Sequence, residues 1–250
     1  MWGTIIDKKT CFTAETIQTR LSANPFAKLS DIVLDIIQEA IINLDILPGE
    51  KINMTAIAES LNVSRAPVRE AISALVKEGF VVEKPNVNGY YALDISDKYM
   101  AEFFVARSTI EVAAIRICAA RFHSIDCRHL KECCDVFRRC YKTNDYEAFV
   151  AADRDFHGSL VQYTGNSFLI NMYASLNRTI AYYSSLSRYY LKNYGSRDIF
   201  NDFELLINEH LAMYNAIRTG LVDCAASTAQ RHLDTCYSSF VHYYLTKGVR

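Results

Sequence analysis

Apolar residues recur every three or four positions along most of the chain, which is the spacing of helices with one buried face. The first such stripe covers residues 26–44 and ends at residues 47–50, where Pro48 and Gly49 predict a turn. A short helix over residues 55–61 is expected next. Residues 1 to about 24, before the first stripe, show no strong periodicity, and we expect them to form a loosely ordered arm.

The next segment, VSRAPVREAISALVKEGF over residues 63–80, predicts a helix with two different faces. Arg65 and Arg69 are four residues apart and share one face near the N-terminal end. Ser64 is a suitable N-cap, and Pro67 lies in the first turn, where its missing N–H removes no helical hydrogen bond. Apolar side chains at i, i+4, i+7 and i+8 form the buried face: Val68, Ile72, Leu75 and Val76.

After Gly79 the spacing changes to the alternation of strands, with PNVNG in the middle, which predicts a hairpin. From residue 97 onward the pattern is helical, with breaks near Ser124, Asn144, Gly165, residues 194–196 and Gly220. We therefore predict a mainly α protein. Residues 25–95 form a winged helix-turn-helix with a small β-hairpin wing, and residues 96–250 form an all-helical bundle of six to seven helices.

Composition supports long helices and narrows the class of protein. Four prolines and nine glycines in 250 residues are few, and half of the residues are apolar. A net charge of −1 excludes a strongly basic coat for nucleic acid. No segment reaches ~18 uncharged apolar residues, and the start lacks the apolar core of a signal peptide, so we expect a cytoplasmic protein with no membrane partner. The eight cysteines form no C-x-x-C pair, which favours reduced thiols packed in helices.

The run PGEKINMTAIAESLNVSRAPVREAISALVKEGFV resembles the DNA-binding domain of the GntR family of bacterial transcription regulators. In the second half, DRDFHGSLVQYTGN, NEHLAMYNAIRTG and the later RHL are similar to the helical effector domain of the FadR branch, the FCD type. The resemblance implies a homodimeric regulator that is not an enzyme. It further implies repression of a metabolic operon through a palindromic double-stranded DNA operator, and an effector that is a small organic acid or similar metabolite.

The two arginines have a physical role in such a protein, because the first turn of a recognition helix enters the major groove, where arginine binds guanine edges or phosphates. Residues 1–95 carry nine Lys/Arg against twelve Asp/Glu, a net of −3. Attraction to phosphate must therefore come from a local patch of Arg65 and Arg69, with Lys77 and Lys84 as candidate further members. The wing also lacks a basic residue before its glycine. The DNA-contacting set that the resemblance implies is Thr55, Ser64, Arg65, Ala66, Arg69 and Gly89.

Asp153 and His157 are four residues apart and project from one face of a predicted helix, and His210 and His232 lie in two later helices. One carboxylate and three imidazoles suit a divalent cation such as Zn²⁺, Ni²⁺ or Mn²⁺. The resemblance places this quartet at the branch's metal positions, with Zn²⁺ first among the three. Cys236, one turn after His232, is an alternative thiolate ligand.

Arg107 matches an arginine that faces the ligand cavity in the resembling branch, where it binds the effector. The alternative for Arg107 is an i,i+4 ion pair with Glu111 on a solvated face.

Two other functions are compatible with these residues. The first is a metal-dependent enzyme of the hydrolase type built on the Asp/His₃ set. No Glu is expected beside the ligands as a general base, which argues against such an enzyme. The second is a DNA-binding protein whose helical domain only dimerises. A ligand-responsive transcription regulator is the leading prediction.

Overall fold

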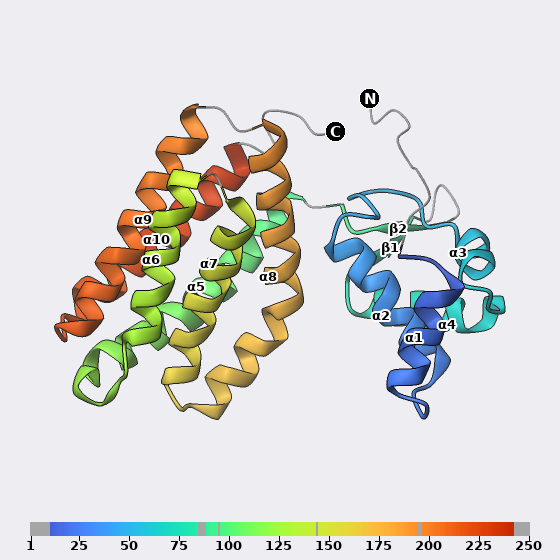
Figure 1. Cartoon of the computed structure of the whole chain (residues 1–250), viewed down its shortest axis with the longest axis horizontal. Helices are drawn as coiled ribbons and strands as arrows, with labels where there is room; N and C mark the ends of the chain where they lie inside the picture. The colour runs from blue at the N-terminus through green and yellow to red at the C-terminus, as the bar shows by residue number, and fades with distance from the viewer. Residues whose placement is uncertain (1–10, 85–88, 95, 144, 195–196, 243–250) are drawn as a thin grey trace. The chain divides into compact units, whose positions relative to one another are not determined.

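The computed structural model describes residues 11–84, 89–94, 96–143, 145–194 and 197–242 of the chain. The chain divides into two compact units between Ser96 and Asp97. Both are rich in helix, and the described residues contain one small antiparallel sheet, in the first unit (Figure 1). The mainly α fold with a winged helix-turn-helix and a helical bundle is confirmed.

The first unit is built on helix α4, which packs against α2, α3 and β1. Val68, Ile72 and Leu75 of α4 are fully buried, as the spacing predicts. Strands β1 and β2 pair antiparallel with Val82 opposite Tyr91. The elements of the unit are α1 (Ala14–Ala23), α2 (Leu29–Ile42), α3 (Met54–Ser60), α4 (Arg65–Lys77), β1 (Val81–Glu83) and β2 (Tyr90–Ala92).

The turn between α3 and α4 depends on Asn62, whose φ of 54° lies in the left-handed region. Asparagine tolerates this conformation better than most residues, so the turn is sharp at little cost. Ser64 is the N-cap of α4, but its side chain makes no capping hydrogen bond. The third helical residue after it is Pro67, which has no N–H for a serine hydroxyl to bind.

The prediction of a loosely ordered arm over residues 1 to about 24 is wrong for its second half. Helix α1 occupies Ala14–Ala23 and packs against α2, and residues 1–10 lie outside the described part of the chain. Thr13 caps α1 by accepting a hydrogen bond from the backbone N–H of Thr16, and Phe12 and Ile17 are buried. Two apolar anchors over this length are too few to give a periodic signal.

The first predicted helix begins later than expected, because Lys28 is the N-cap of α2 and Phe26 is 98% exposed. Phe26 therefore does not belong to the apolar stripe. The hairpin is present as β1 and β2, while residues 85–88 of PNVNG lie outside the described residues.

The second unit contains six α-helices in its described residues, which agrees with the predicted six to seven. Helix α10 packs against α5 and α9, and α7 packs against α5, α6 and α8 (Figure 1). A core around Phe137 and Phe156 lies among these helices. The elements are α5 (Asp97–Ala120), a 3₁₀ turn (Phe122–Ser124), α6 (Arg128–Thr143), α7 (Tyr146–Tyr163), α8 (Ser167–Tyr194), α9 (Arg197–Arg218) and α10 (Val222–Phe240).

The breaks between these helices agree with the sequence near Ser124, Gly165 and Gly220, whereas Asn144 and residues 195–196 lie outside the described part. Gly220 has a φ of 70°, and a Cβ there would approach the Phe122 ring to 2.7 Å. Glycine is thus required at this turn for conformation and for space.

None of the eight cysteines, all of which lie in the described residues, forms a disulfide, and five of them are buried: Cys118, Cys133, Cys134, Cys140 and Cys236.

Candidate metal centre and nucleic-acid interface

The four residues predicted as metal ligands converge in the helical unit. Asp153 and His157 come from α7, His210 from α9 and His232 from α10. His157 Nε2 lies 3.2 Å from His210 Nε2 and 3.2 Å from His232 Nε2. Asp153 Oδ1 lies 3.2 Å from His210 Nε2 and 3.7 Å from His157 Nε2. One ligand atom from each of the four therefore meets in a space the size of a single ion.

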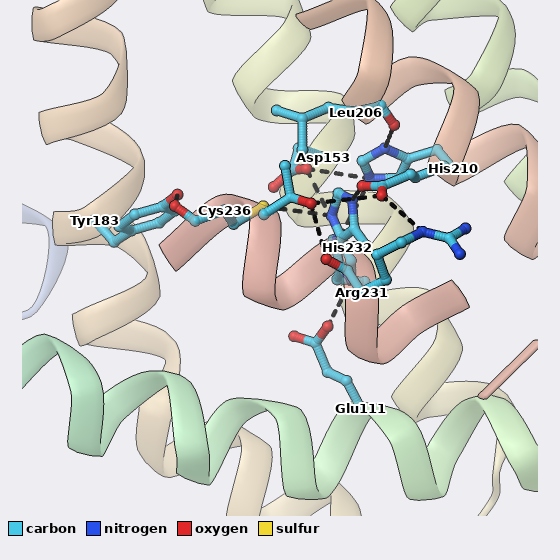
Figure 2. Close-up of polar contacts among 11 residues, drawn as sticks. Glu111, Asp153, Tyr183, Leu206, His210, Arg231, His232 and Cys236 are labelled. Carbon is cyan, nitrogen blue, oxygen red and sulfur yellow. Dashed lines mark hydrogen bonds and ion pairs between the residues drawn. The ribbon is translucent and has the colours of Figure 1, made fainter. Parts of the chain in front are cut away.

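The outer nitrogen of each imidazole is held by an acceptor, which fixes the ring and directs Nε2 inward. Such outer contacts are typical of histidines that bind metals, because they select the tautomer with a free Nε2 lone pair. The Nδ1 contacts are His157 with Glu111 Oε2 at 2.6 Å, His210 with the carbonyl oxygen of Leu206 at 2.8 Å, and His232 with Glu209 Oε2 at 3.2 Å. Figure 2 shows Glu111 and Leu206 on different sides of the cluster.

The rings are also fixed by packing, since Phe137 and Phe156 lie against His210 with centroids 4.4 and 4.9 Å away. The three histidine side chains are at most 2% exposed, while that of Asp153 is 22% exposed. The donor set is therefore enclosed by protein everywhere except beside the carboxylate.

Electrostatics distinguish the three histidines. Burial acts to lower the pKa of His157, but Glu111 and Asp153 outweigh it and raise the pKa to about 9. Burial lowers the pKa of His210 and, together with the neighbouring imidazoles, lowers that of His232 well below its usual value. Without a cation, His157 is thus the one positively charged imidazole of the three near neutral pH, and His210 and His232 are neutral.

These residues fit a divalent cation. In a tetrahedral Zn²⁺ site with bonds of about 2.0–2.2 Å, ligand atoms are about 3.3–3.6 Å apart, close to the spacings within the quartet. Two neutral imidazoles with Nε2 lone pairs at this distance would repel each other unless a proton or a cation lay between them. Nitrogen and carboxylate donors suit Zn²⁺, Ni²⁺ and Mn²⁺, so the donor set agrees with the prediction without selecting among the three.

Cys236, the alternative ligand, lies beside the quartet. Its Sγ lies 3.6 Å from His232 Nε2, but burial raises the pKa of the thiol far above its usual value. In Figure 2 its sulfur approaches the cluster from α10, on the side away from Arg231. Without a cation the thiol therefore stays protonated, and its role as an alternative ligand stays a prediction.

Arg107 is fully buried, and its Nε donates to Glu111 Oε1 at 2.6 Å. The predicted i,i+4 pair therefore exists, but its predicted position on a solvated face is wrong. The pair is buried because α5 packs against α7 and α10, and Glu111 continues the chain of contacts to His157. The role of Arg107 in binding an effector stays a prediction.

Two glutamates that the sequence did not place beside the ligands, Glu111 and Glu209, contact them. They contact the outer nitrogens, however, so neither is directed at the inner space where a bound water would need a base. Glu209 itself accepts a hydrogen bond from Arg231 Nε at 3.2 Å. Reasoning from the sequence missed both residues, although the position of Glu209, next to His210, was a usable signal.

The predicted DNA-contacting residues gather at the start of two helices of the first unit. Ser64, Arg65, Ala66 and Arg69 are all exposed at the N-terminal end of α4, and Thr55 is half-buried in the first turn of α3. The acidic side chain next to these arginines, Glu70, is paired with Lys28 at 2.7 Å. The exposed face of α4 is therefore cationic at its N-terminal end, as a groove-binding helix requires.

The wing has a basic residue, Lys51, that sequence reasoning did not place there, in addition to Lys84. Lys51 forms a bridge with Tyr91 beside β2, and a Cβ on Gly89 would come within 3.0 Å of Lys51 Cε. Lys84 lies over the Tyr91 ring at 4.7 Å. Two ammonium groups thus lie near Gly89, although the residues before it in the sequence are not basic.

Family models match both units of the chain. Residues 102–235, more than half of the chain, match the family model described as "FCD domain". Residues 29–88 match the model described as "Bacterial regulatory proteins, gntR family". The chain is a GntR-family regulator with an FCD domain.

Relatives of this regulator span nearly its full length. It is 25% identical over 218 residues to the HTH-type transcriptional repressor RspR of Escherichia coli strain K12, covering 87% of this chain and 90% of that protein. It is 24% identical to the HTH-type transcriptional repressor NanR of Enterobacter sp. strain 638, covering 92% and 93%. A putative transcriptional regulator GntR from Rhodococcus sp. RHA1 shares the fold, with a TM-score of 0.65, 20% identity and coverage of 86% and 98%.

Within the described part of the regulator, no helix has both the length and the apolar content that crossing a bilayer requires.

Proposed function

We propose that this regulator is a ligand-responsive transcriptional repressor that binds a palindromic double-stranded DNA operator as a homodimer. The observation that carries the proposal is the exposure of Arg65 and Arg69 on one end of α4, in a winged helix-turn-helix unit. Two relatives of the chain, RspR and NanR, are named transcriptional repressors, which supports repression over activation.

The arginines would read the operator in the major groove. A guanidinium group bonds the O6 and N7 atoms of guanine in a bidentate manner, or grips a phosphate. Ser64 and the first N–H groups of α4 can hold a neighbouring phosphate, because a helix N-terminus attracts anions. One such helix reads only a few base pairs, so specific binding requires two copies on two half-sites.

Arg65→Ala and Arg69→Ala test this assignment. Each is expected to lower specific operator binding by about 1–3 kcal/mol and to relax the base preference at one position, while the fold is unchanged. Binding is measured by fluorescence anisotropy on an operator selected from random DNA. Arg128→Ala, an exposed arginine of the helical unit, is the control. Wild-type affinity in both α4 variants would contradict the assignment.

The second part of the proposal concerns the helical unit. Asp153, His157, His210 and His232 would hold a divalent cation, Zn²⁺ before Ni²⁺ or Mn²⁺, and the carboxylate of a small organic acid would complete its coordination. The partial exposure of Asp153 supports access for such a ligand from that side. Because the Nε of Arg107 is bonded to Glu111, a second clamp on the carboxylate would use the terminal nitrogens of Arg107.

A cation helps here because a carboxylate that enters an apolar helical cavity needs a fixed positive partner. The effector can change operator affinity only through its differential affinity for two arrangements of the protein. The change in operator affinity on adding the effector therefore measures the coupling free energy between the two sites.

The double variant His157→Ala/His210→Ala tests the sensing function. It is expected to lose the bound cation and the response to the effector, and to keep operator binding, since α4 is unchanged. Native mass spectrometry reports the metal content, and anisotropy with candidate organic acids reports the response. His123→Ala, an exposed histidine in the 3₁₀ turn, is the control. Stoichiometric metal in the double variant, or a wild-type response, would refute the assignment.

A further inference from the structure

A second group of potential ligands lies outside the quartet, between α6 and α7. His129 and Cys133 are one turn apart on α6, and Asp155 faces them from α7. His129 Nε2 lies 2.9 Å from Asp155 Oδ2 and 3.9 Å from Cys133 Sγ. The three ligand atoms lie within 4.8 Å of one another. One nitrogen, one sulfur and one oxygen thus converge on a single point.

The orientation of His129 favours a ligand role. Its Nε2 is the nitrogen that faces the thiol and the carboxylate, while its Nδ1 lies 3.5 Å from Glu132 Oε2. An acceptor near the outer nitrogen is the arrangement that directs a histidine lone pair toward a cation. The outer contact of His129 is longer and more exposed than those in the quartet, but it likewise leaves Nε2 as the nitrogen that faces the other donors.

The spacings are close to those of an occupied site. Bonds of about 2.0–2.3 Å in a tetrahedral Zn²⁺ site separate the ligand atoms by about 3.3–3.8 Å. The observed 2.9 and 3.9 Å lie on either side of this range, so binding needs shifts of a fraction of an ångström. The side chains of His129 and Asp155 are 41% and 56% exposed, which leaves them room to move.

The simpler explanation is a surface His–Asp pair beside a packed thiol. Burial raises the pKa of Cys133 to about 11, so the thiol stays protonated without a cation. That pair alone, however, does not require a sulfur at the i+4 position within reach of the same nitrogen. The three donor types together are those that Zn²⁺ prefers over Mg²⁺ or Ca²⁺.

We propose that His129, Cys133 and Asp155 form a second metal site, which binds Zn²⁺ or a similar borderline divalent cation and leaves a fourth position open to water. As the sulfur–metal bond forms, the thiol proton of Cys133 passes to solvent. The ligands of this second site are distinct from those of the quartet, because Asp153 and Asp155 are two residues apart on α7 and project about 160° apart around the helix axis. A cation there would link α6 to α7.

Cobalt substitution tests the proposal with a signal specific to sulfur. The full-length His157→Ala/His210→Ala variant, which lacks two ligands of the quartet, is titrated with Co²⁺. One equivalent is expected to bind with a sulfur-to-cobalt charge-transfer band in the near ultraviolet. Cys133→Ser in this background should abolish the band. Cys224→Ser, at an exposed thiol of α10, and Cys236→Ser, near the quartet, should leave it unchanged.

Absence of the band, or a band that survives Cys133→Ser and disappears with Cys236→Ser, would overturn the proposal. A second measurement does not depend on the double variant. The wild-type protein is titrated with Zn²⁺, and Asp155→Asn, a change at an exposed position, is expected to bind one equivalent fewer. Equal Zn²⁺ stoichiometry in the wild type and in Asp155→Asn would also overturn the proposal of a second site. Loss of metal from the quartet alone would contradict only the proposed sensing function.

Discussion

Glu111 controls the charge state of His157. Burial acts to raise the pKa of Glu111, but Arg107, followed by His157, lowers it to about 2, so the carboxylate is ionised throughout the physiological range. That fixed negative charge is in turn the largest of the influences that raise the pKa of His157 to about 9. A cation that binds the quartet must therefore displace a proton from His157, and metal affinity should fall as the pH drops below about 9.

Glu111→Gln is expected to weaken metal binding by about 10–100-fold, the usual effect of losing an outer contact to a ligand. It should also lower the pKa of His157, so that metal binding near neutral pH releases less than the nearly full proton released by the wild type. Calorimetry in two buffers of different ionisation enthalpy measures both quantities.

The control for this prediction is Glu102→Gln, an exposed glutamate on the same helix. Glu111→Gln leaves Arg107 buried without its charged partner, so we also expect this variant to lose about 3–5 kcal/mol of stability. Thermal unfolding of the metal-free protein measures this loss. Unchanged proton release in a folded variant would show that Glu111 does not set the pKa of His157.

The wing is completed by a segment that is distant in sequence. The backbone N–H of Ile52 donates to the carbonyl of Tyr90 at 2.8 Å, and that of Ala92 donates to the carbonyl of Glu50 at 2.9 Å. The segment around Lys51 thus lies along β2 and brings its ammonium group to Gly89. The wing acquires a basic group through pairing and not through its own turn.

Lys51→Ala is expected to weaken binding to specific and nonspecific DNA about equally and to reduce the slope of log affinity against log salt by about 1, because one phosphate contact is lost. Filter binding over a series of salt concentrations measures the slope. Lys98→Ala, an exposed lysine in the helical unit, serves as control. An unaltered slope would place the Lys51 side chain away from DNA.

Local patterns were enough to predict most elements and the Asp153–His157 pair, whereas His210 and His232 were joined to that pair through the resemblance to the FadR branch. Helices such as α4 and α7 could be predicted because their apolar residues repeat at helical spacing. Arg65 and Arg69 could be placed on a shared face because they are four residues apart. Helix α1 was not predicted because its buried apolar contacts come from Phe12 and Ile17, which are too few to give a periodic pattern. Glu111 was missed because i,i+4 spacing reveals a partner on the same helix but not which helix packs over it.

In the proposed function, operator recognition by the whole molecule depends on dimerisation. Helix α8 exposes two apolar side chains one turn apart, Phe168 at 81% and Met172 at 52%. Exposed apolar residues grouped on one element are typical of contact surfaces. They are therefore our candidates for the two-fold contact between helical units.

The double variant Phe168→Asp/Met172→Asp is expected to weaken dimerisation at least about tenfold, since two charges would replace apolar contacts at the interface core. Operators with half-sites one helical turn or a multiple of it apart should then lose their advantage over a single half-site. Analytical ultracentrifugation measures the first effect and anisotropy the second. Leu221→Asp, at another exposed apolar position, is the control. A wild-type protein that is monomeric at micromolar concentration would remove the dimer from the proposal.

The burial of the quartet also affects how fast a bound cation can exchange. The histidines are closed off by protein, and each ring is held by a contact on its outer side, so a bound cation has one way out, past Asp153. We expect exchange along such a route to be slow compared with the binding of a small acid. The ion in each molecule would then reflect the cell's metal supply when that molecule folded. Later swings in metal concentration would leave the response to the metabolite undisturbed.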